Sequence, residues 1–367
     1  MLVNTAACTL MSPEQLDGLC RQFQRDGYVV IEDALSPVQL HDVRAECDAV
    51  TARYAEIAGV NQSPEGLHDD DDENTDDVPD QHEHADDICT SQWLSDTFGC
   101  ILEVPGCCEC CGCVDATRGG YRAKSCAVTG SSALQINEML RPNGVFGEIA
   151  TALLGTFSDD QLPIQKQTPP HLFNDQYIVK PKTSHTARFA WHWDSQWCDG
   201  DSEVENTETE KTKKRKRNYD DTTPNYISLW TALDDVDAKN GCIRVLPYPG
   251  RTGDTEKKES NTSQSSKHAP RYKHGPSKLN VFATRQWSKS ISKHDQQFAI
   301  NALNDMKTLK MSAGSILAMS NKVLHCSGPN ASTKKRRAWM PQFSAGPVFK
   351  NDDEKKTVAL AVPLSKI

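Results

Sequence analysis

The sequence predicts a mainly β domain with packed helices, an α+β chain organised as a sandwich or barrel. Two observations predict this class. The first 60 residues carry helix signals on either side of one strand, and the chain from residue 173 onward is made of short apolar runs separated by irregular loops. Several strands with few helices between them are typical of sandwiches and barrels, whose interior can hold a site. At 367 residues the chain can bury one large core or two modest ones.

The N-terminal part is predicted as helix, strand and helix. Residues 12–27, SPEQLDGLCRQFQRDG, open with a Ser-x-x-Gln capping box and have Pro13 in the first turn. Residues 36–59 repeat the capping box, and YVVIEDAL at 28–35 predicts a strand between the two helices. A further helix is predicted at 143–154, NGVFGEIATALL.

Six apolar runs in the second half of the chain predict strands, because they are short, rich in β-formers and bounded by turn residues. They are residues 174–180, 187–193, 225–233, 242–248, 314–320 and 337–345.

Three polar runs predict long loop insertions into a single domain. Residues 65–87 contain acids and histidines but no Lys or Arg, so self-repulsion and low hydrophobicity favour a disordered loop. Residues 199–224 begin acidic and then contain KTKKRKR, and residues 251–294 are rich in Ser, Lys and Gly. The predicted division is an N-terminal helix-strand-helix part of the domain at 1–60, an acidic and cysteine-rich insertion at 61–130, the core at 131–348 and a C-terminal tail at 349–367.

Fourteen cysteines are scattered along the chain apart from one dense patch, which favours free thiols in a reducing compartment. The patch reads CCECCGC and contains overlapping C-x-x-C pairs that could bind zinc. A structural zinc site usually has two separated pairs, so a flexible thiol-rich loop is the alternative. The patch consists of Cys107, Cys108, Cys110, Cys111 and Cys113, with Cys100 and Cys126 nearby.

Charge and hydropathy point to an intracellular protein without a membrane segment. The net charge of −9 does not favour nucleic acid as a binding partner. No apolar run approaches the roughly 18 residues of a membrane helix, and the N-terminus lacks the pattern of a signal peptide. KKRKR at 213–217 suggests nuclear import, although a solvated charge run is commoner. Ser365-Lys366-Ile367 is a variant of the S-K-L peroxisomal signal, so cytoplasm and peroxisome are both compatible.

The stretch RFAWHWDSQW contains an H-x-D triplet, His192 and Asp194. On a strand these two side chains would project to the same face, while Trp191 and Trp193 would pack on the other. One face would then carry two metal ligands. Taken alone, the triplet is more often a hydrogen-bonded pair than a ligand set.

A third ligand is expected on a distant strand, because iron(II) oxygenases commonly use two His and one carboxylate on one face of the metal. His325 follows the strand-and-turn pattern GSILAMSNKVL and precedes the turn CSGPN. Eleven residues later, Arg336 begins another strand and could pair bidentately with the carboxylate of a dicarboxylate cosubstrate. The alternative is that both histidines are buried, hydrogen-bonded residues without a metal and that Arg336 is a surface residue.

Six stretches in order resemble the phytanoyl-CoA dioxygenase family of iron(II)- and 2-oxoglutarate-dependent oxygenases. They are DGYVVIEDALSPVQLHDVRAE, NDQYIVKP, FAWHWDSQW, ISLWTALDDVDAKNGCIRVLP, GSILAMSNKVLHCSGPN and RRAW, spread over about residues 12–348. The family's fold is a double-stranded β-helix, a cupin-like jelly roll, so the resemblance implies that fold with N-terminal helices and long loop insertions.

The resemblance also implies roles for seven residues. The iron ligands would be His192, Asp194 and His325. Arg336 would hold the distal carboxylate of 2-oxoglutarate, with Arg337 as its rival, and Ser327 would support that carboxylate. Residues lining the cosubstrate pocket would be Gln176 and Trp230.

The resemblance implies a dioxygenase that uses iron(II), 2-oxoglutarate and O2, releases succinate and CO2, and hydroxylates a C–H bond of a small molecule or an acyl substrate such as an acyl-CoA. Related halogenases replace the aspartate with a small residue, and Asp194 is intact here, so hydroxylation is favoured. Two alternatives are a non-catalytic jelly-roll protein that binds through its cysteine-rich and basic insertions, and an oxygenase acting on chromatin or protein, suggested by the basic run alone.

Overall fold

The structure is a computed structural model that describes residues 11–57, 101–103, 131–157, 170–197, 226–248, 301, 304–350, 353–357 and 360–367. Its helices and 3-10 turns are α1 (Pro13–Asp26), α2 (Pro37–Ile57), α4 (Ser131–Leu140), α5 (Val145–Gly155), η3 (Asp194–Trp197) and η4 (Leu364–Lys366). Its strands are β1 (Tyr28–Ile31), β2 (Ile101–Glu103), β3 (His171–Lys180), β4 (Phe189–His192), β5 (Tyr226–Ala232), β6 (Ile243–Leu246), β7 (Lys307–Thr308), β8 (Ile316–Ser320), β9 (Leu324–Ser327), β10 (Arg336–Ser344), β11 (Phe349–Lys350), β12 (Asp353–Thr357) and β13 (Val362–Pro363).

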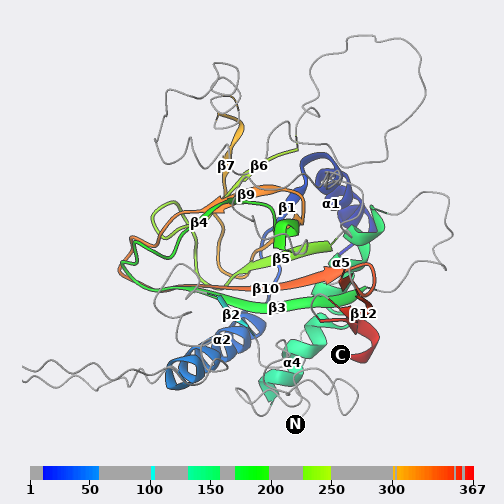
Figure 1. The fold of residues 1–367 in the computed structure, drawn as a ribbon, viewed down its shortest axis with the longest axis horizontal. Coiled ribbons are helices and arrows are strands. Elements are labelled where there is room, and N and C mark those ends of the chain that lie inside the picture. Colours follow the sequence, from blue (N-terminus) through cyan, green and yellow to red (C-terminus); the bar gives the residue numbers. More distant parts are fainter. Residues whose placement is uncertain are drawn as a thin grey trace, which may run out of the picture.

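The described strands form two main antiparallel sheets. The large sheet has seven strands in the order β1-β8-β5-β10-β3-β13, with β2 paired to β3, and the small sheet has the order β4-β9-β6-β7. The large sheet crosses the centre of Figure 1, with the small sheet above it and α2 and α4 below it. The predicted class of mainly β with packed helices is therefore confirmed.

The inner faces of the two sheets share one apolar cluster. The large sheet contributes Ile178, Trp230 and Met340, and the small sheet contributes Ile243 and Val245. Alternate residues of each strand point inward, as the two-residue period of a strand requires. This inner layer surrounds the site described below.

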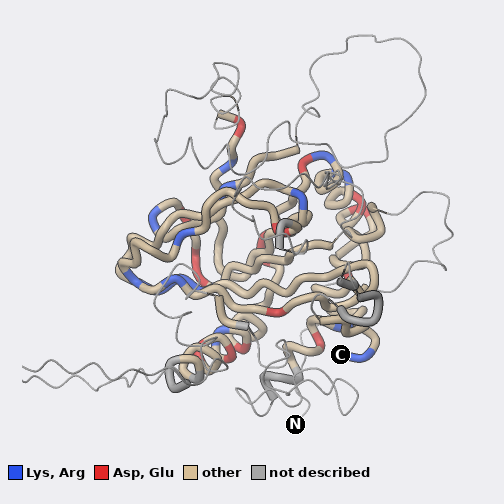
Figure 2. Tube along the Cα trace, in the orientation of Figure 1, with Lys and Arg blue, Asp and Glu red and all other residues tan. Residues whose placement is uncertain are grey.

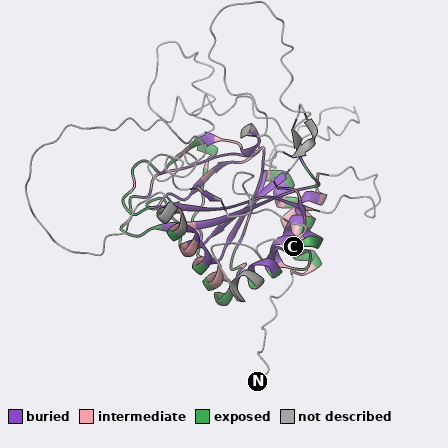
Figure 3. Cartoon of the chain, turned by 60° about the horizontal axis from the view of Figure 1, so that its bottom comes forward, coloured by how far each residue is buried: buried purple, intermediate pink, exposed green. Residues whose placement is uncertain are grey.

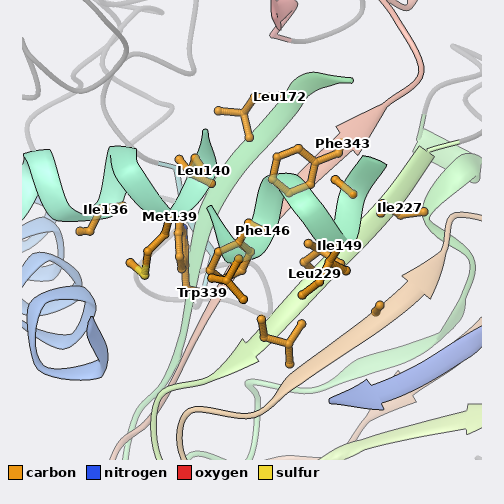
Figure 4. Close-up of a cluster of buried hydrophobic side chains, with 14 of the residues drawn as sticks. Ile136, Met139, Leu140, Phe146, Ile149, Leu172, Ile227, Leu229, Trp339 and Phe343 are labelled. Carbon is orange, nitrogen blue, oxygen red and sulfur yellow. The ribbon is translucent and has the colours of Figure 1, made fainter. Parts of the chain in front are cut away.

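The outer face of the large sheet is covered by helices. Phe146 of α5 meets Trp339 of β10 with ring centroids 4.6 Å apart, and both side chains are fully buried. Figure 4 shows Met139 and Leu140 of α4 beside them, above the strands that carry Leu229 and Trp339. Figure 3 shows helices at the edge of the molecule that carry buried residues as well as exposed ones.

The predicted helix signals at the N-terminus are confirmed. Ser12 caps α1 by accepting from the Gln15 backbone N–H, and the Gln15 side chain accepts from the Ser12 backbone N–H at 2.7 Å. Gly27 ends α1 with a φ of 80°, the left-handed conformation that glycine adopts without strain. The strand predicted to reach residue 35 ends at Ile31, because Asp33 turns the chain with a φ of 49°.

Two segments add structure beyond the predicted elements. Helix α4 was not predicted, and its buried Ile136, Met139 and Leu140 pack in the core formed with α2 and α5. In the predicted tail, β13 pairs with β3 and the final residue Ile367 is buried in the same core. The predicted insertion at 61–130 contributes strand β2 to the large sheet.

Charged residues avoid most of the sheet interior. Figure 2 shows Lys, Arg, Asp and Glu mainly on the helices and at the loop ends, and the long strands largely without them. Within the part of the chain that the structure describes, no helix is both long and apolar enough to cross a membrane. The cysteine patch at 107–113 lies outside the described residues.

Phe146→Ala is expected to lower the free energy of unfolding by about 3–5 kcal/mol, because it removes a fully buried ring and leaves a cavity against Trp339. Val38→Ala is the control, since Val38 is 65% exposed and should change stability by less than about 0.5 kcal/mol. Urea unfolding followed by far-UV circular dichroism measures both variants. A loss in Phe146→Ala no larger than that of the control would contradict the packing described here.

Candidate metal centre

Two paired strands of the small sheet bring the predicted histidines together. Strands β4 and β9 are antiparallel, and His192 lies directly opposite His325. The two imidazole rings have centroids 4.2 Å apart. Residues opposite each other on paired strands point to the same face, so both rings project toward the interior.

Asp194 reaches the histidines from a turn and not from a strand. Strand β4 ends at His192, and Asp194 is the first residue of the 3-10 turn η3. The chain leaves the strand here because the Ser195 backbone N–H donates to the Asn321 carbonyl, 3.0 Å away, outside the strand ladder. The strand predicted over 187–193 was therefore too long. His192 and Asp194 do face a common point as predicted, but a turn brings them there and not the alternation of a strand.

The tryptophans behave as predicted. Trp191 is buried in an apolar cluster on the opposite face of the small sheet with Leu246, Leu324 and Cys326, and Trp193 packs against it. These residues are packing groups, which leaves the inner face of β4 and β9 to polar side chains.

The three side chains offer a compact ligand set. One ligand atom from each of His192, Asp194 and His325 lies within 4.8 Å of the others. Asp194 Oδ1 is 3.9 Å from His192 Nε2 and 3.5 Å from His325 Nε2. Two imidazole nitrogens and one carboxylate oxygen facing a common point match the donor set of non-haem iron(II) sites.

Hydrogen bonds fix which nitrogen of each ring faces that point. His192 Nδ1 lies 2.7 Å from the Ala190 carbonyl oxygen, and His325 Nδ1 lies 3.0 Å from the Val323 carbonyl oxygen. A carbonyl only accepts, so each Nδ1 carries the proton and each Nε2 keeps its lone pair. Metal-binding histidines are commonly held this way, so the residues present fit a divalent metal.

Burial keeps the His192 ring neutral. Burial is the main cause that lowers its pKa to about 4, and the neighbouring His325 lowers it further, while the Asp194 carboxylate acts in the opposite direction. A neutral imidazole is the form that binds metal. Protons therefore compete little for this ligand at neutral pH.

The second oxygen of Asp194 is bound by residues of the large sheet. Ser228 of β5 donates its hydroxyl to Asp194 Oδ2, and Gln342 of β10 donates Nε2 to the same oxygen at 3.2 Å. Gln342 also donates to Ser228 Oγ at 2.8 Å. Asn174 of β3 continues the row, donating to Gln342 Oε1 and to Gln176 Oε1 at 3.3 Å each. Gln176 is thus linked to the triad through other side chains.

Two buried cations lie next to this site on neighbouring strands. Arg336 of β10 lies directly opposite Lys180 of β3, and both are almost fully buried. Lys180 Nζ donates to Ser327 Oγ at 2.7 Å, and Ser327 is two residues from His325 on the same face of β9. The Arg336 guanidinium lies 5.3 Å from the Trp230 ring centroid.

Gly241 lines the end of this cation pair. Its carbonyl accepts from Arg336 Nη2 at 3.2 Å. Its φ is 83°, and a Cβ there would lie 2.5 Å from the Gly328 carbonyl oxygen and 3.2 Å from Lys180 Nζ. Only glycine fits this close approach of backbone to backbone.

The two candidate arginines lie on opposite sides of β10. Arg336 points into the interior, whereas Arg337 donates to both Asp234 oxygens and to Asp48, at distances between 2.7 and 3.1 Å. These hydrogen bonds, led by those to Asp234, raise the Arg337 pKa. Arg337 therefore connects α2 to the large sheet.

Four polar residues of this region were not predicted from the sequence. Lys180, Ser228, Gln342 and Asn174 all stand in strands whose other residues are mostly apolar and buried. A lysine closing the run YIVK and a glutamine inside RAWMPQFS are the signals that could have pointed to them.

Comparison with known proteins places the chain in a family. Residues 23–338 match the family model described as phytanoyl-CoA dioxygenase (PhyH). This match covers well over half of the chain, so the chain belongs to the phytanoyl-CoA dioxygenase family. The resemblance stated from the sequence motifs is therefore confirmed.

A curated relative matches a shorter stretch. The phytanoyl-CoA dioxygenase domain-containing protein 1 homolog of Dictyostelium discoideum is 26% identical over 129 residues, which cover 34% of this chain and 38% of the relative. The chain thus matches little more than a third of that relative's length.

Several solved structures resemble the chain at low identity. The non-heme alpha ketoglutarate dependent epimerase SnoN from nogalamycin biosynthesis has 14% identity and a TM-score of 0.44, over 91% of this chain and 82% of that one. SnoN in complex with Fe3+, alpha ketoglutarate and nogalamycin RO has 14% identity and a TM-score of 0.41, over 90% and 84%. The non-heme monooxygenase ThoJ in complex with Ni has 14% identity and a TM-score of 0.44, over 94% and 83%.

The depressed pKa of His192 predicts a pH dependence of the metal-free protein. Below pH 6.5 the unfolded chain gains a proton on this residue that the folded chain accepts only near pH 4, so stability falls as the pH falls through this window. Between pH 7 and pH 5 this contribution is about 2 kcal/mol. His192→Gln should lack it, and His185→Gln, at an exposed position, should keep it. Urea unfolding of the chelator-treated variants at both pH values measures the difference, and equal pH dependence in wild type and His192→Gln would contradict the assignment.

Proposed function

We propose that this chain is an iron(II)- and 2-oxoglutarate-dependent dioxygenase that hydroxylates a C–H bond of a small molecule. The observation that carries the proposal is the combination of a ligand set of two histidines and one carboxylate with a pair of buried cations on the same interior surface. His325 and Ser327 are neighbours on one face of β9, and Ser327 contacts Lys180 of the cation pair. A metal and a short dicarboxylate would thus be held side by side.

The metal ligands in this proposal are His192, Asp194 and His325. When bound, iron(II) and 2-oxoglutarate supply the activation of O2 that yields succinate, CO2 and an oxidised substrate. His192, Asp194 and His325 would hold the metal, and a donor set of three protein ligands would leave room for the cosubstrate and O2. The backbone carbonyls at Ala190 and Val323 keep both rings in the tautomer that binds metal.

The cosubstrate would lie between the triad and the cation pair. Two residues along a strand span about 7 Å, so the step from His325 to Ser327 is comparable to the length of a five-carbon dicarboxylate. Arg336 would bind the distal carboxylate bidentately, and Lys180 would approach it with Ser327. Two cations side by side repel each other, and a carboxylate between them offsets that repulsion. Trp230 would form the wall beneath the guanidinium.

Gln176 has a second role in this proposal besides the pocket-lining role that the resemblance implies. It belongs to the polar row that ends at Asp194 Oδ2, through Asn174 and Gln342. We propose that it borders the cosubstrate pocket from β3 and steadies this row.

We also propose that the fold is a double-stranded β-helix. Two antiparallel sheets whose inner faces share one core support a double-stranded β-helix with the site between the sheets. We propose the core at 131–348 as the oxygenase domain, with 1–60 as its N-terminal part and 61–130, 199–224 and 251–294 as insertions. The substrate is a small molecule or an acyl compound.

The proposed compartment is the cytoplasm or the peroxisome. Ile367, the last residue of the Ser365-Lys366-Ile367 tripeptide, is buried, and its backbone oxygen accepts from Arg141 Nε at 2.9 Å. A receptor that reads this tripeptide would have to detach it from the core first.

Anaerobic titration of the purified apoprotein with iron(II) and 2-oxoglutarate is expected to produce a visible metal-to-ligand charge-transfer band, and Asp194→Ala is expected to abolish it. Arg336→Gln should weaken 2-oxoglutarate binding by roughly 100-fold or more, because removing one partner of a buried charge pair costs about 3–5 kcal/mol. Arg337→Gln is the matched control and should keep wild-type affinity, since its side chain faces Asp234 and Asp48. Loss of the band in Arg337→Gln but not in Arg336→Gln would contradict the assignment, and no band in the folded wild type would refute the oxygenase proposal.

Lys180→Met tests the second cation. It should weaken 2-oxoglutarate binding about tenfold while leaving the affinity for the metal alone unchanged, because Lys180 donates to Ser327, which is not one of the proposed metal ligands. Lys182→Met, at an exposed position two residues further on, is the control. Unchanged 2-oxoglutarate affinity in Lys180→Met would remove Lys180 from the pocket.

A further inference from the structure

The Asp194 carboxylate is held from two sides, and the two sides use different oxygens. Oδ1 faces the Nε2 atoms of His192 and His325 at 3.9 and 3.5 Å. Oδ2 accepts from Ser228 and from Gln342. Ser228 and Gln342 lie opposite each other on adjacent strands β5 and β10, so the large sheet presents both donors together.

The hydrogen bonds of this row run in one direction. An ionised carboxylate only accepts, so the single Ser228 hydroxyl proton goes to Asp194 and Ser228 Oγ is left to accept from Gln342 Nε2, 2.8 Å away. The Gln342 amide group therefore turns its NH2 toward Asp194, and its Oε1 accepts from Asn174 Nδ2. The Ser228 hydroxyl and the Gln342 NH2 group each donate to an acceptor in this row, which fixes the orientation of the Gln342 side chain.

We propose that Ser228 and Gln342 are positioning residues that keep Asp194 a one-oxygen ligand, an inference that rests on the proposed metal site. With Oδ2 held by two donors, the carboxylate cannot turn to offer both oxygens to the metal without breaking two buried hydrogen bonds. A carboxylate that used both oxygens would occupy one more coordination position. Ser228 and Gln342 thus preserve the position that a cosubstrate or O2 requires.

Burial makes this restraint strong. Ser228 is fully buried, and Asp194 and Gln342 are each 6% exposed, so water offers little competition for Oδ2. Both donors come from strands in the middle of the large sheet, whose backbone is held on both sides. The hydrogen bonds of the large sheet therefore hold both donors in place beside Asp194.

The test is metal binding to the full-length apoprotein, using Co(II) alone as the probe under anaerobic conditions. Ser228→Ala removes one donor, and Gln342→Glu keeps the shape of the side chain but replaces the donating NH2 with an oxygen. Ser228→Ala is expected to weaken Co(II) binding by about 10- to 100-fold, the usual effect of removing a partner of a metal ligand. Gln342→Glu also adds a negative charge beside the metal, so its main readout is the absorption spectrum. Each should also change the visible absorption of bound Co(II), which reports the coordination number.

Thr231→Val is the matched control. Thr231 is a fully buried residue of β5 like Ser228, but three residues along the strand places it on the opposite face, toward the helices. This variant removes a buried hydroxyl without touching Asp194. It should bind Co(II) with the wild-type affinity and spectrum, whatever it does to stability.

The outcomes separate positioning from a purely structural role. If Ser228→Ala and Gln342→Glu melt at lower temperature but bind Co(II) with wild-type affinity and spectrum, the positioning role is overturned. If only Gln342→Glu fails to fold, Ser228→Ala alone decides the question, because it creates the smallest cavity. If the folded wild type binds no Co(II), both the proposed metal site and this inference are wrong. If the wild type and both variants bind Co(II) with the same affinity and spectrum, only the positioning role is refuted.

Discussion

The geometry of the site depends on the contacts of the Asp194 carboxylate, because this group interacts with side chains of both sheets. One of its oxygens faces the histidines of the small sheet, and the other is held by Ser228 and Gln342 of the large sheet. The histidines are fixed to each other by strand pairing, but nothing in that pairing sets their distance from the large sheet. The short turn η3 brings the carboxylate into the space between the sheets.

The interior is divided into two regions of different charge, and that division suits the proposed chemistry. The triad contributes one carboxylate and two imidazoles, whereas Lys180 and Arg336 contribute two positive charges on neighbouring strands. Burying charged groups is costly, so a fold keeps them where they interact with other groups or with a ligand. A metal at the first region and a dicarboxylate reaching the second would use both.

The helical layer gives the large sheet the rigidity that this arrangement needs. Trp339 packs against Phe146 of α5 on the outer face, and its Nε1 donates to the buried Asp175 at 2.7 Å. Next to Trp339 on β10, the inner face carries Met340 and Gln342. Alternation along one strand thus ties the packing of the helices directly to the residues that hold Asp194.

The sequence predicted much of the fold and part of the site for physical reasons that are local. Ser12, Pro13 and Gly27 set the ends of α1 through capping and backbone conformation, which depend on a few neighbouring residues. Apolar runs predicted the long strands, and the ordered motifs around His192, Asp194 and His325 predicted the family and named the three residues that come together. Helix α4 escaped prediction because its stability comes from packing against α2 and α5.

By itself the sequence determined the capped helices, the strand-rich second half and the identity of the candidate ligands, since these follow from residue type and local pattern. Only the tertiary structure decided that Asp194 approaches from a turn, that Lys180 lies opposite Arg336, and that Ser228 and Gln342 hold the second carboxylate oxygen. The reason is that strand register and the stacking of two sheets join residues that lie from 34 to more than 150 positions apart. No local sequence pattern predicts which of the polar residues on buried strands contact one another in the folded protein.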